Sequence, residues 1–142
     1  MTNLLKETEL KLNVKFGDYY KNFLLKGCDE IIEDTFDFIG NNGKDSSDIL
    51  DFFFLNNNEE YSILNRTKDF KNRIPENFIA IGHDSGGNLI LMEKLTEEIY
   101  FWDHELENDE ADMSNCYFLA NNFKEFFEEK LYEYVLEDDD ED

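Results

Sequence analysis

The clearest pattern of apolar and polar positions lies between Pro75 and Asp103. Apolar runs from Phe78 to Gly82 and from Leu89 to Met92 flank HDSGGN, a segment dense in residues that tolerate positive φ. A third apolar run, IYFWD, spans Ile99 to Asp103 after a polar turn. The pattern predicts a three-stranded antiparallel meander, and because both parities of the runs are apolar, it predicts helices over one face.

A helix is predicted on each side of this meander. Tyr20, Phe23 and Leu24 have one-face helical spacing, with Asp18 as a starting cap and Gly27 at the C-terminal end. The second helix begins at Asn122, which forms a variant capping box with Glu125. Its apolar face is Phe123, Phe126, Phe127, Leu131 and Tyr134.

The middle of the chain has a weaker pattern. LDFFFL, Leu50 to Leu55, favours a buried strand, whereas Asp34 to Asp48 lacks periodicity and contains a GNNG loop at 40–43. Tyr61 to Asn65 fits either a strand or the first turn of a helix that runs through Phe70.

The length of 142 residues and the absence of a linker predict one domain over residues 1–136, followed by an acidic tail at 137–142, EDDDED. No segment has the length and apolar character of a signal peptide or a membrane span, which predicts a cytoplasmic protein. Cys28 and Cys116 match no metal-ligand spacing, and in a reducing compartment we interpret them as free, buried thiols.

The formal net charge is −22, and it is unevenly distributed. Residues 1–75 carry 10 basic and 14 acidic residues, whereas residues 76–142 carry 3 and 21. Such a charge argues against nucleic acid or an anionic membrane as a direct partner, because phosphate binding requires Lys and Arg. It favours a basic partner, or no partner at all.

Two patterns invite a chemical interpretation. His83-Asp84 and Asp103-His104 each follow a predicted strand, so a metal or general-base site would form if those strands aligned; roles in turns and strand ends are the alternative, and the one we favour. The DSGGN segment lacks GK[ST] and GxGxxG, which favours a hairpin turn over a phosphate loop. These patterns therefore favour a protein that is not an enzyme, has no small-molecule substrate and holds no metal.

Trp102 directly precedes an acidic cluster that runs from Asp103 to Asp112. Such a cluster can simply keep a surface hydrated, but an aromatic anchor beside carboxylates is also typical of protein interfaces. From expected exposure and charge, the candidate partner-binding residues are Asp84, Trp102, Asp103, His104, Glu105, Glu107, Asp109, Glu110 and Asp112.

The motifs together resemble the SUKH superfamily, which includes fungal Smi and Knr proteins and many bacterial immunity proteins. The resemblance rests on IPENFIAIGHDSGGNLILM, IYFWDHE and FLANNFKEFFEEKL in that order. The matching positions are Ile74, Pro75, Gly82, Gly87, Trp102, Asp103, His104, Ala120, Phe123, Phe126 and Phe127. Near the N-terminus, Phe16 to Tyr20 and Gly27-Cys28 replace the Leu-Pro and Asn-Gly-Gly of the family, which leaves the subgroup open.

The resemblance implies an α+β fold, with an antiparallel or mixed sheet around a central meander and with N-terminal and C-terminal helices at its flanks. It also implies that the chain has no catalytic residues and no cofactor. It implies an immunity protein that neutralises a cognate bacterial toxin, a nuclease-type domain with basic surface, by forming a stoichiometric complex. A regulatory scaffold of the fungal Smi/Knr type is the alternative. An acidic DNA mimic would also use the charge, but it should bind many basic proteins with similar affinity.

Overall fold

The computed structural model describes residues 2–27, 33–39, 45–53, 55, 62–84, 87–103 and 116–132. The helices are α1 (Thr2–Leu12), α2 (Asp18–Gly27), α3 (Ile63–Asp69), α4 (Phe123–Glu125) and the π-helical turn η2 (Phe126–Lys130). The strands are β1 (Glu33–Ile39), β2 (Asp45–Phe52), β3 (Phe78–His83), β4 (Leu89–Glu93), β5 (Ile99–Trp102), β6 (Cys116–Ala120) and β7 (Leu131–Tyr132). In this part of the chain, no helix combines the length and apolar character needed to cross a membrane.

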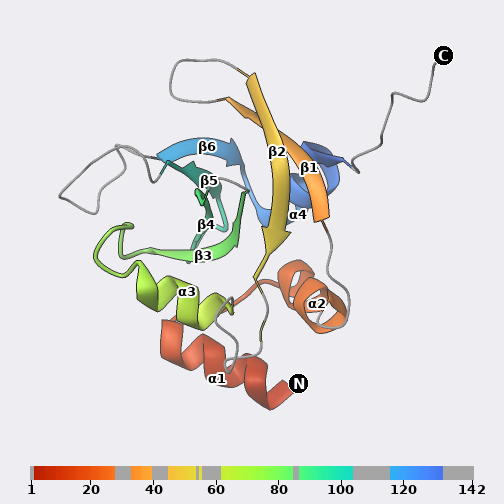
Figure 1. Ribbon diagram of the computed structural model, residues 1–142. Coiled ribbons are helices and arrows are strands. Elements are labelled where there is room, and N and C mark those ends of the chain that lie inside the picture. Colours follow the sequence, from red (N-terminus) through yellow and green to blue (C-terminus); the bar gives the residue numbers. More distant parts are fainter. Residues whose placement is uncertain are drawn as a thin grey trace.

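The described strands form one sheet in the order β6-β5-β4-β3-β2-β1-β7, and each neighbouring pair is antiparallel. Strands β1 to β6 therefore follow one another across the sheet in chain order, with α3 inserted between β2 and β3 (Figure 1). The predicted meander is confirmed as β3, β4 and β5. The α+β class and the antiparallel sheet are confirmed with it.

Helix α3 begins where a serine side chain accepts one of the backbone N–H groups of its first turn. The Ser62 side chain accepts a hydrogen bond from the backbone N–H of Asn65 at 3.0 Å. Thr67, one turn further on, accepts the backbone N–H of Ala80 at 2.9 Å, which ties the helix to β3. Helix α1 packs against α3, and α2 packs against α4 on the side of β1 and β2 (Figure 1).

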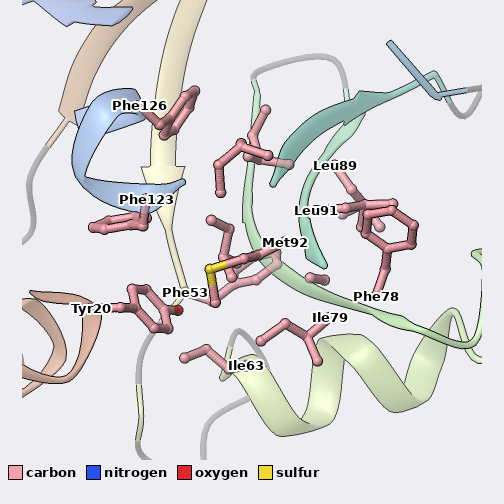
Figure 2. Packing of buried hydrophobic residues seen from close by; sticks show 14 of the residues in the cluster. Tyr20, Phe53, Ile63, Phe78, Ile79, Leu89, Leu91, Met92, Phe123 and Phe126 are labelled. Atoms are coloured by element: carbon pink, nitrogen blue, oxygen red, sulfur yellow. The ribbon is translucent and has the colours of Figure 1, made fainter. Parts of the chain in front are cut away.

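An aromatic cluster joins the C-terminal segment to the rest of the core. Phe123 is fully buried, and its ring centroid lies 4.7 Å from that of Tyr20 and 5.0 Å from that of Phe23, both on α2. Phe52 of β2 lies at 5.9 Å from the same ring. Figure 2 shows Phe123 and Tyr20 facing each other at the side of the sheet where Met92 lies. The ring of Phe123 thus joins α2, β2 and α4, which are far apart in the sequence.

The central strands are buried on both faces, as the apolar runs predicted. Every residue of β3 from Phe78 to Gly82 and of β4 from Leu89 to Met92 is buried. Phe78 packs edge-to-face against Tyr100 of β5 at 5.3 Å, and Tyr100 packs against Phe118 of β6 at 5.7 Å. Phe118 ends this row of rings and is 48% exposed.

Several elements differ from the sequence-based expectation. Neither α1 nor β6 was predicted, and β1 occupies part of the segment that lacked periodicity. The ambiguous segment 61–65 contributes the start of a helix, α3. Strand β2 begins at Asp45 and so extends well beyond the predicted Leu50 start.

The C-terminal helix is shorter than predicted. It is confirmed to start at Asn122, whose side chain accepts the backbone N–H of Glu125 at 2.8 Å. After three α-helical residues the chain changes to the π-helical turn η2 and then to β7, where Leu131 pairs with Phe36 of β1. The prediction that Leu131 belongs to the apolar helix face is therefore wrong, because pairing with the edge of β1 satisfies the backbone there. Tyr134 lies outside the described residues.

Candidate protein-binding surface

The two strand ends singled out by the sequence lie at the same end of the sheet. His83 of β3 pairs with Leu89 of β4, and Leu89 pairs with Trp102 of β5. The alignment that a shared His-Asp site would require is therefore present, but β4 lies between the two strands and separates them by about 10 Å. Among the described residues, no group of three or more His, Cys, Asp or Glu side chains could hold a metal ion, and His104 lies outside those residues.

Asp84 closes the turn between β3 and β4. Its carboxylate accepts hydrogen bonds from the backbone N–H of Asn88 at 2.9 Å and from the Asn88 side-chain amide at 3.0 Å. The backbone N–H of Asp84 donates to the Asn88 carbonyl at 3.0 Å, and Gly87 takes up a φ of 90°. Asp84 is 3% exposed, so the expectation that it is presented to a partner is wrong. Its carboxylate instead stabilises the turn between β3 and β4.

Trp102 belongs to the core. It is 2% exposed, and its ring packs edge-to-face against Phe70, the residue that caps the end of α3, at 5.5 Å. The guanidinium of Arg73 lies 5.1 Å from the centre of the indole. The expectation of an exposed aromatic anchor at Trp102 is therefore corrected, because helix α3 and the arginine that follows it cover this ring.

Asp103, the next residue, is half-buried and is the described start of the acidic cluster. The remaining candidate residues, His104, Glu105, Glu107, Asp109, Glu110 and Asp112, lie outside the described residues, and their contact with a partner stays a prediction. Cys116 follows the cluster at the start of β6 and is half-buried, whereas Cys28 lies outside the described residues.

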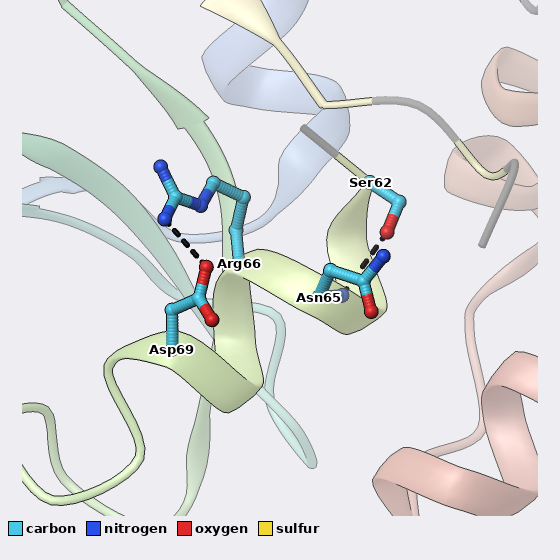
Figure 3. A network of polar contacts seen from close by, with 4 residues as sticks. All are labelled: Ser62, Asn65, Arg66 and Asp69. Carbon is cyan, nitrogen blue, oxygen red and sulfur yellow. Dashed lines mark hydrogen bonds and ion pairs between the residues drawn. The ribbon is translucent and has the colours of Figure 1, made fainter. Parts of the chain in front are cut away.

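A small hollow of about 240 Å³ lies beside the β3–β4 turn. His83 stacks on Phe53 with ring centroids 5.4 Å apart, and its Nδ1 lies 2.8 Å from the Asp84 carbonyl oxygen. On the α3 side, Arg66 contributes to the lining and forms an ion pair with Asp69 at 2.5 Å (Figure 3). The hollow is smaller than ordinary ligand pockets of roughly 300–1,000 Å³. We interpret it as packing around the turn.

Acidic residues also occupy the two long strands β1 and β2, which the sequence analysis did not consider as a site. Glu33, Asp34 and Asp37 stand on β1, and the register sets Glu33 opposite Asp51 of β2. Alternation of Phe36 and Phe38 with polar neighbours is the signal that could have identified β1.

A second acidic position lies where α2 meets η2. Tyr19 donates a hydrogen bond to the Glu128 carboxylate at 2.7 Å. Burial, the hydrogen bond to Glu128 and the charge of Glu128 raise the pKa of Tyr19 to about 12. Glu128 and its neighbour Glu129 are exposed, so they are acidic surface positions that lie outside the predicted cluster in the sequence.

Together, these observations define an α+β domain with an antiparallel sheet flanked by helices and with exposed acidic residues, Glu128 and Glu129, on η2. The chain belongs to the SMI1/KNR4 family (SUKH-1), whose sequence model matches residues 2–129. It is 32% identical over 137 residues to the SPbeta prophage-derived uncharacterized protein YokK of Bacillus subtilis (strain 168), a match that covers 86% of this chain and 70% of that protein. No solved structure matches the chain.

Proposed function

We propose that this chain is an immunity protein, which acts in the cytoplasm to bind and neutralise a cognate bacterial toxin in a stoichiometric complex. The observation that carries the proposal is the net charge of −22 in a member of the SMI1/KNR4 family. The proposed role involves neither catalysis nor a cofactor, and the chain acts by covering a surface of its partner.

The charge also suggests the kind of toxin. A nuclease must present basic surface to its phosphate substrate, so a strongly acidic protein is steered toward that surface and can occlude it. Support comes from acidic residues on several elements: β1 and β2, Asp103, and Glu128 and Glu129. The cluster from Glu105 to Asp112 is the proposed centre of the contact.

Co-expression tests the proposal directly. The C-terminal domain of the polypeptide encoded next to this gene would be expressed alone and together with this chain. We expect the domain to be lethal when expressed alone and harmless when co-expressed with this chain. The two proteins should be recovered as a one-to-one complex. If co-expression does not rescue growth and the two proteins do not co-purify, the immunity role is rejected and a scaffold of the Smi/Knr type is favoured.

Charge reversal tests whether the acidic cluster contacts the toxin. The triple variant Asp109→Lys, Glu110→Lys and Asp112→Lys should slow association with the toxin roughly tenfold at low salt and weaken its salt dependence. The measurement is the association rate constant by surface plasmon resonance across a series of NaCl concentrations.

A matched control separates local contact from net charge. Glu7→Lys, Asp69→Lys and Glu76→Lys change the total charge by the same amount at exposed positions outside the cluster and outside the other acidic residues cited above in support of the proposal. If the control slows association as much as the cluster variant does, the cluster is not the contact surface. The immunity proposal itself would still rest on the co-expression result.

A further inference from the structure

Lysines gather around one groove of this otherwise acidic protein. The groove consists of two adjoining hollows of about 720 and 520 Å³ that share Asn13 and Lys94. It runs along α1 to the β4–β5 turn and the end of α3. The lysines that line this lysine groove are Lys6, Lys11, Lys15, Lys68, Lys71 and Lys94. They are six of the 13 basic residues in the chain, against two glutamates in the same lining.

Most of this positive charge is available to a partner. Within the described part of the chain, Lys11 pairs with Glu7 at 2.9 Å, and the other five groove lysines form no ion pair. One of the two lining glutamates, Glu9, is engaged elsewhere, because its carboxylate accepts the backbone N–H of Phe16 at 2.7 Å. The groove therefore has a positive local potential on a molecule of net charge −22.

Helix ends explain only part of this arrangement. Lys11 and Lys68 stand in the last turns of α1 and α3, where a cation interacts favourably with the helix dipole. Lys6 lies in the middle of α1, and Lys94 belongs to the β4–β5 turn. These lysines face the same groove without a role at a helix end.

Two leucines border the same groove and are almost fully exposed. Leu10 of α1 is 82% exposed, and Leu95 at the β4–β5 turn is 91% exposed. Lys6, Leu10 and Asn13 follow at i, i+4 and i+7, so they share one face of the helix and its end. A single exposed leucine needs no explanation, but two at one lysine-lined groove add apolar contact surface where the charge is concentrated.

The walls of the groove are held in place by hydrogen bonds. The backbone N–H of Leu95 donates to the Glu93 carboxylate at 2.6 Å, and the N–H of Lys94 donates to the Asn77 carbonyl at 2.9 Å. Gly17 donates its N–H to the Glu97 carboxylate at 2.9 Å, which links the α1–α2 connection to the β4–β5 turn. A preformed groove loses little conformational freedom when it binds a ligand.

We propose that the lysine groove is a docking site for a short acidic segment of a partner protein, one in which leucine-like side chains are interspersed with carboxylates. The lysines complement the carboxylates, and Leu10 and Leu95 complement the apolar side chains. A nucleic acid fits less well, since its phosphates make no use of the leucines and a long polyanion is repelled by the rest of the molecule. At physiological salt, charges more than about 8 Å from a bound peptide are largely screened. A short peptide in the groove therefore interacts mainly with the groove lysines.

This proposal is independent of toxin binding, which uses the acidic surface, and its test requires no toxin. The full chain would be titrated against a short fluorescein-labelled peptide of interspersed Glu and Leu residues, with binding followed by fluorescence anisotropy. Companion probes replace Leu by Ser or Glu by Gln, and a labelled oligothymidine represents nucleic acid. We expect the Glu-Leu peptide to bind most tightly and either replacement to weaken binding.

Paired variants locate the site. Lys15→Glu with Lys71→Glu should weaken peptide binding roughly tenfold, because two attractive contacts become repulsive. Lys21→Glu with Lys124→Glu changes the net charge equally at basic residues outside the groove and should change binding less than twofold. Leu10→Ser with Leu95→Ser should also weaken binding, and both leucines are too exposed for the change to unfold the protein.

Results of three kinds would overturn the proposal. The first is equal loss of binding in the groove and control pairs, or no binding of the peptide to the wild-type chain. The second is tighter binding of oligothymidine than of the peptide, which would make the groove a nucleic-acid site. The third is self-association of the full chain in sedimentation velocity that the groove pair abolishes, which would make a second copy the occupant.

Discussion

Glu93 determines the shape of the β4–β5 turn. One carboxylate oxygen accepts the backbone N–H groups of Leu95 and Thr96 at 2.6 and 2.8 Å, and the other accepts the side-chain amide of Asn77 at 2.9 Å. Burial alone would raise the pKa of Glu93, but the hydrogen bonds from Asn77, Thr96 and Leu95 outweigh it and hold the pKa below its ordinary value. The charged form of Glu93 is therefore the form that the fold stabilises.

Glu93 is expected to make stability depend on pH in the acid range. A carboxyl with a depressed pKa contributes stability above its unfolded pKa, and this contribution is lost as pH falls through the folded pKa. Glu93→Gln should therefore lower the free energy of unfolding by roughly 1 kcal/mol at pH 7, and the difference from wild type should shrink toward pH 3. The measurement is urea unfolding at a series of pH values.

The control for this substitution is Glu129→Gln, because removing any negative charge relieves repulsion in so acidic a chain. Glu129 is exposed on η2, so the control reports the charge effect alone. A Glu93→Gln variant that matches Glu129→Gln at pH 7 would show that the turn does not depend on the carboxylate.

At the scale of elements, the start of α4 depends on one exposed side chain. Asn122 has extended backbone, with φ of −162°, and its side chain accepts the N–H of Glu125. Asn122→Ala should cost about 1 kcal/mol of stability through loss of the cap, whereas Asn122→Ser should retain most of it. Urea midpoints of the two variants give the comparison. Equal midpoints for Ala and Ser would mean that packing of Phe123 alone fixes this helix start.

Elements with a strong local pattern could be predicted from the sequence. The meander was predictable because the runs at 78–82, 89–92 and 99–103 are continuous and separated by turn residues. Helix α1 was not, since its buried stripe combines Leu5 and Leu12 with the polar Thr8, and Leu10 faces outward. The change from η2 to β7 depends on the edge of β1, a partner about 95 residues earlier in the chain that no local window contains.

The candidate surface was predictable only in its charge. Composition located the acidic half of the chain, but exposure is a tertiary property, and the burial of Trp102 depends on Phe70 and Arg73 from another element. The lysine groove was hidden for the same reason. Its lysines are scattered from Lys6 to Lys94, and only the packing of α1 beside α3 and the β4–β5 turn brings them together.

At the scale of the whole molecule, the net charge of −22 opposes the compact state through self-repulsion. Sodium chloride should therefore stabilise the protein, because at 0.1 M salt the screening length falls to about 10 Å, shorter than the span of a domain of this size. Raising NaCl from about 0.02 to 0.5 M should increase the free energy of unfolding by roughly 1 kcal/mol, measured as a rise in the urea midpoint.

The triple variant Asp109→Lys, Glu110→Lys and Asp112→Lys, whose three positions lie in an acidic stretch of the sequence, gives this prediction its internal standard. It brings the formal charge from −22 to −16, so its urea midpoint in low salt should lie above that of the wild type, and its response to NaCl should be smaller. Salt effects unrelated to repulsion would act on both proteins alike. If the two proteins respond equally, the acidity carries no folding cost that salt relieves, and steering of a basic partner is then its remaining physical consequence.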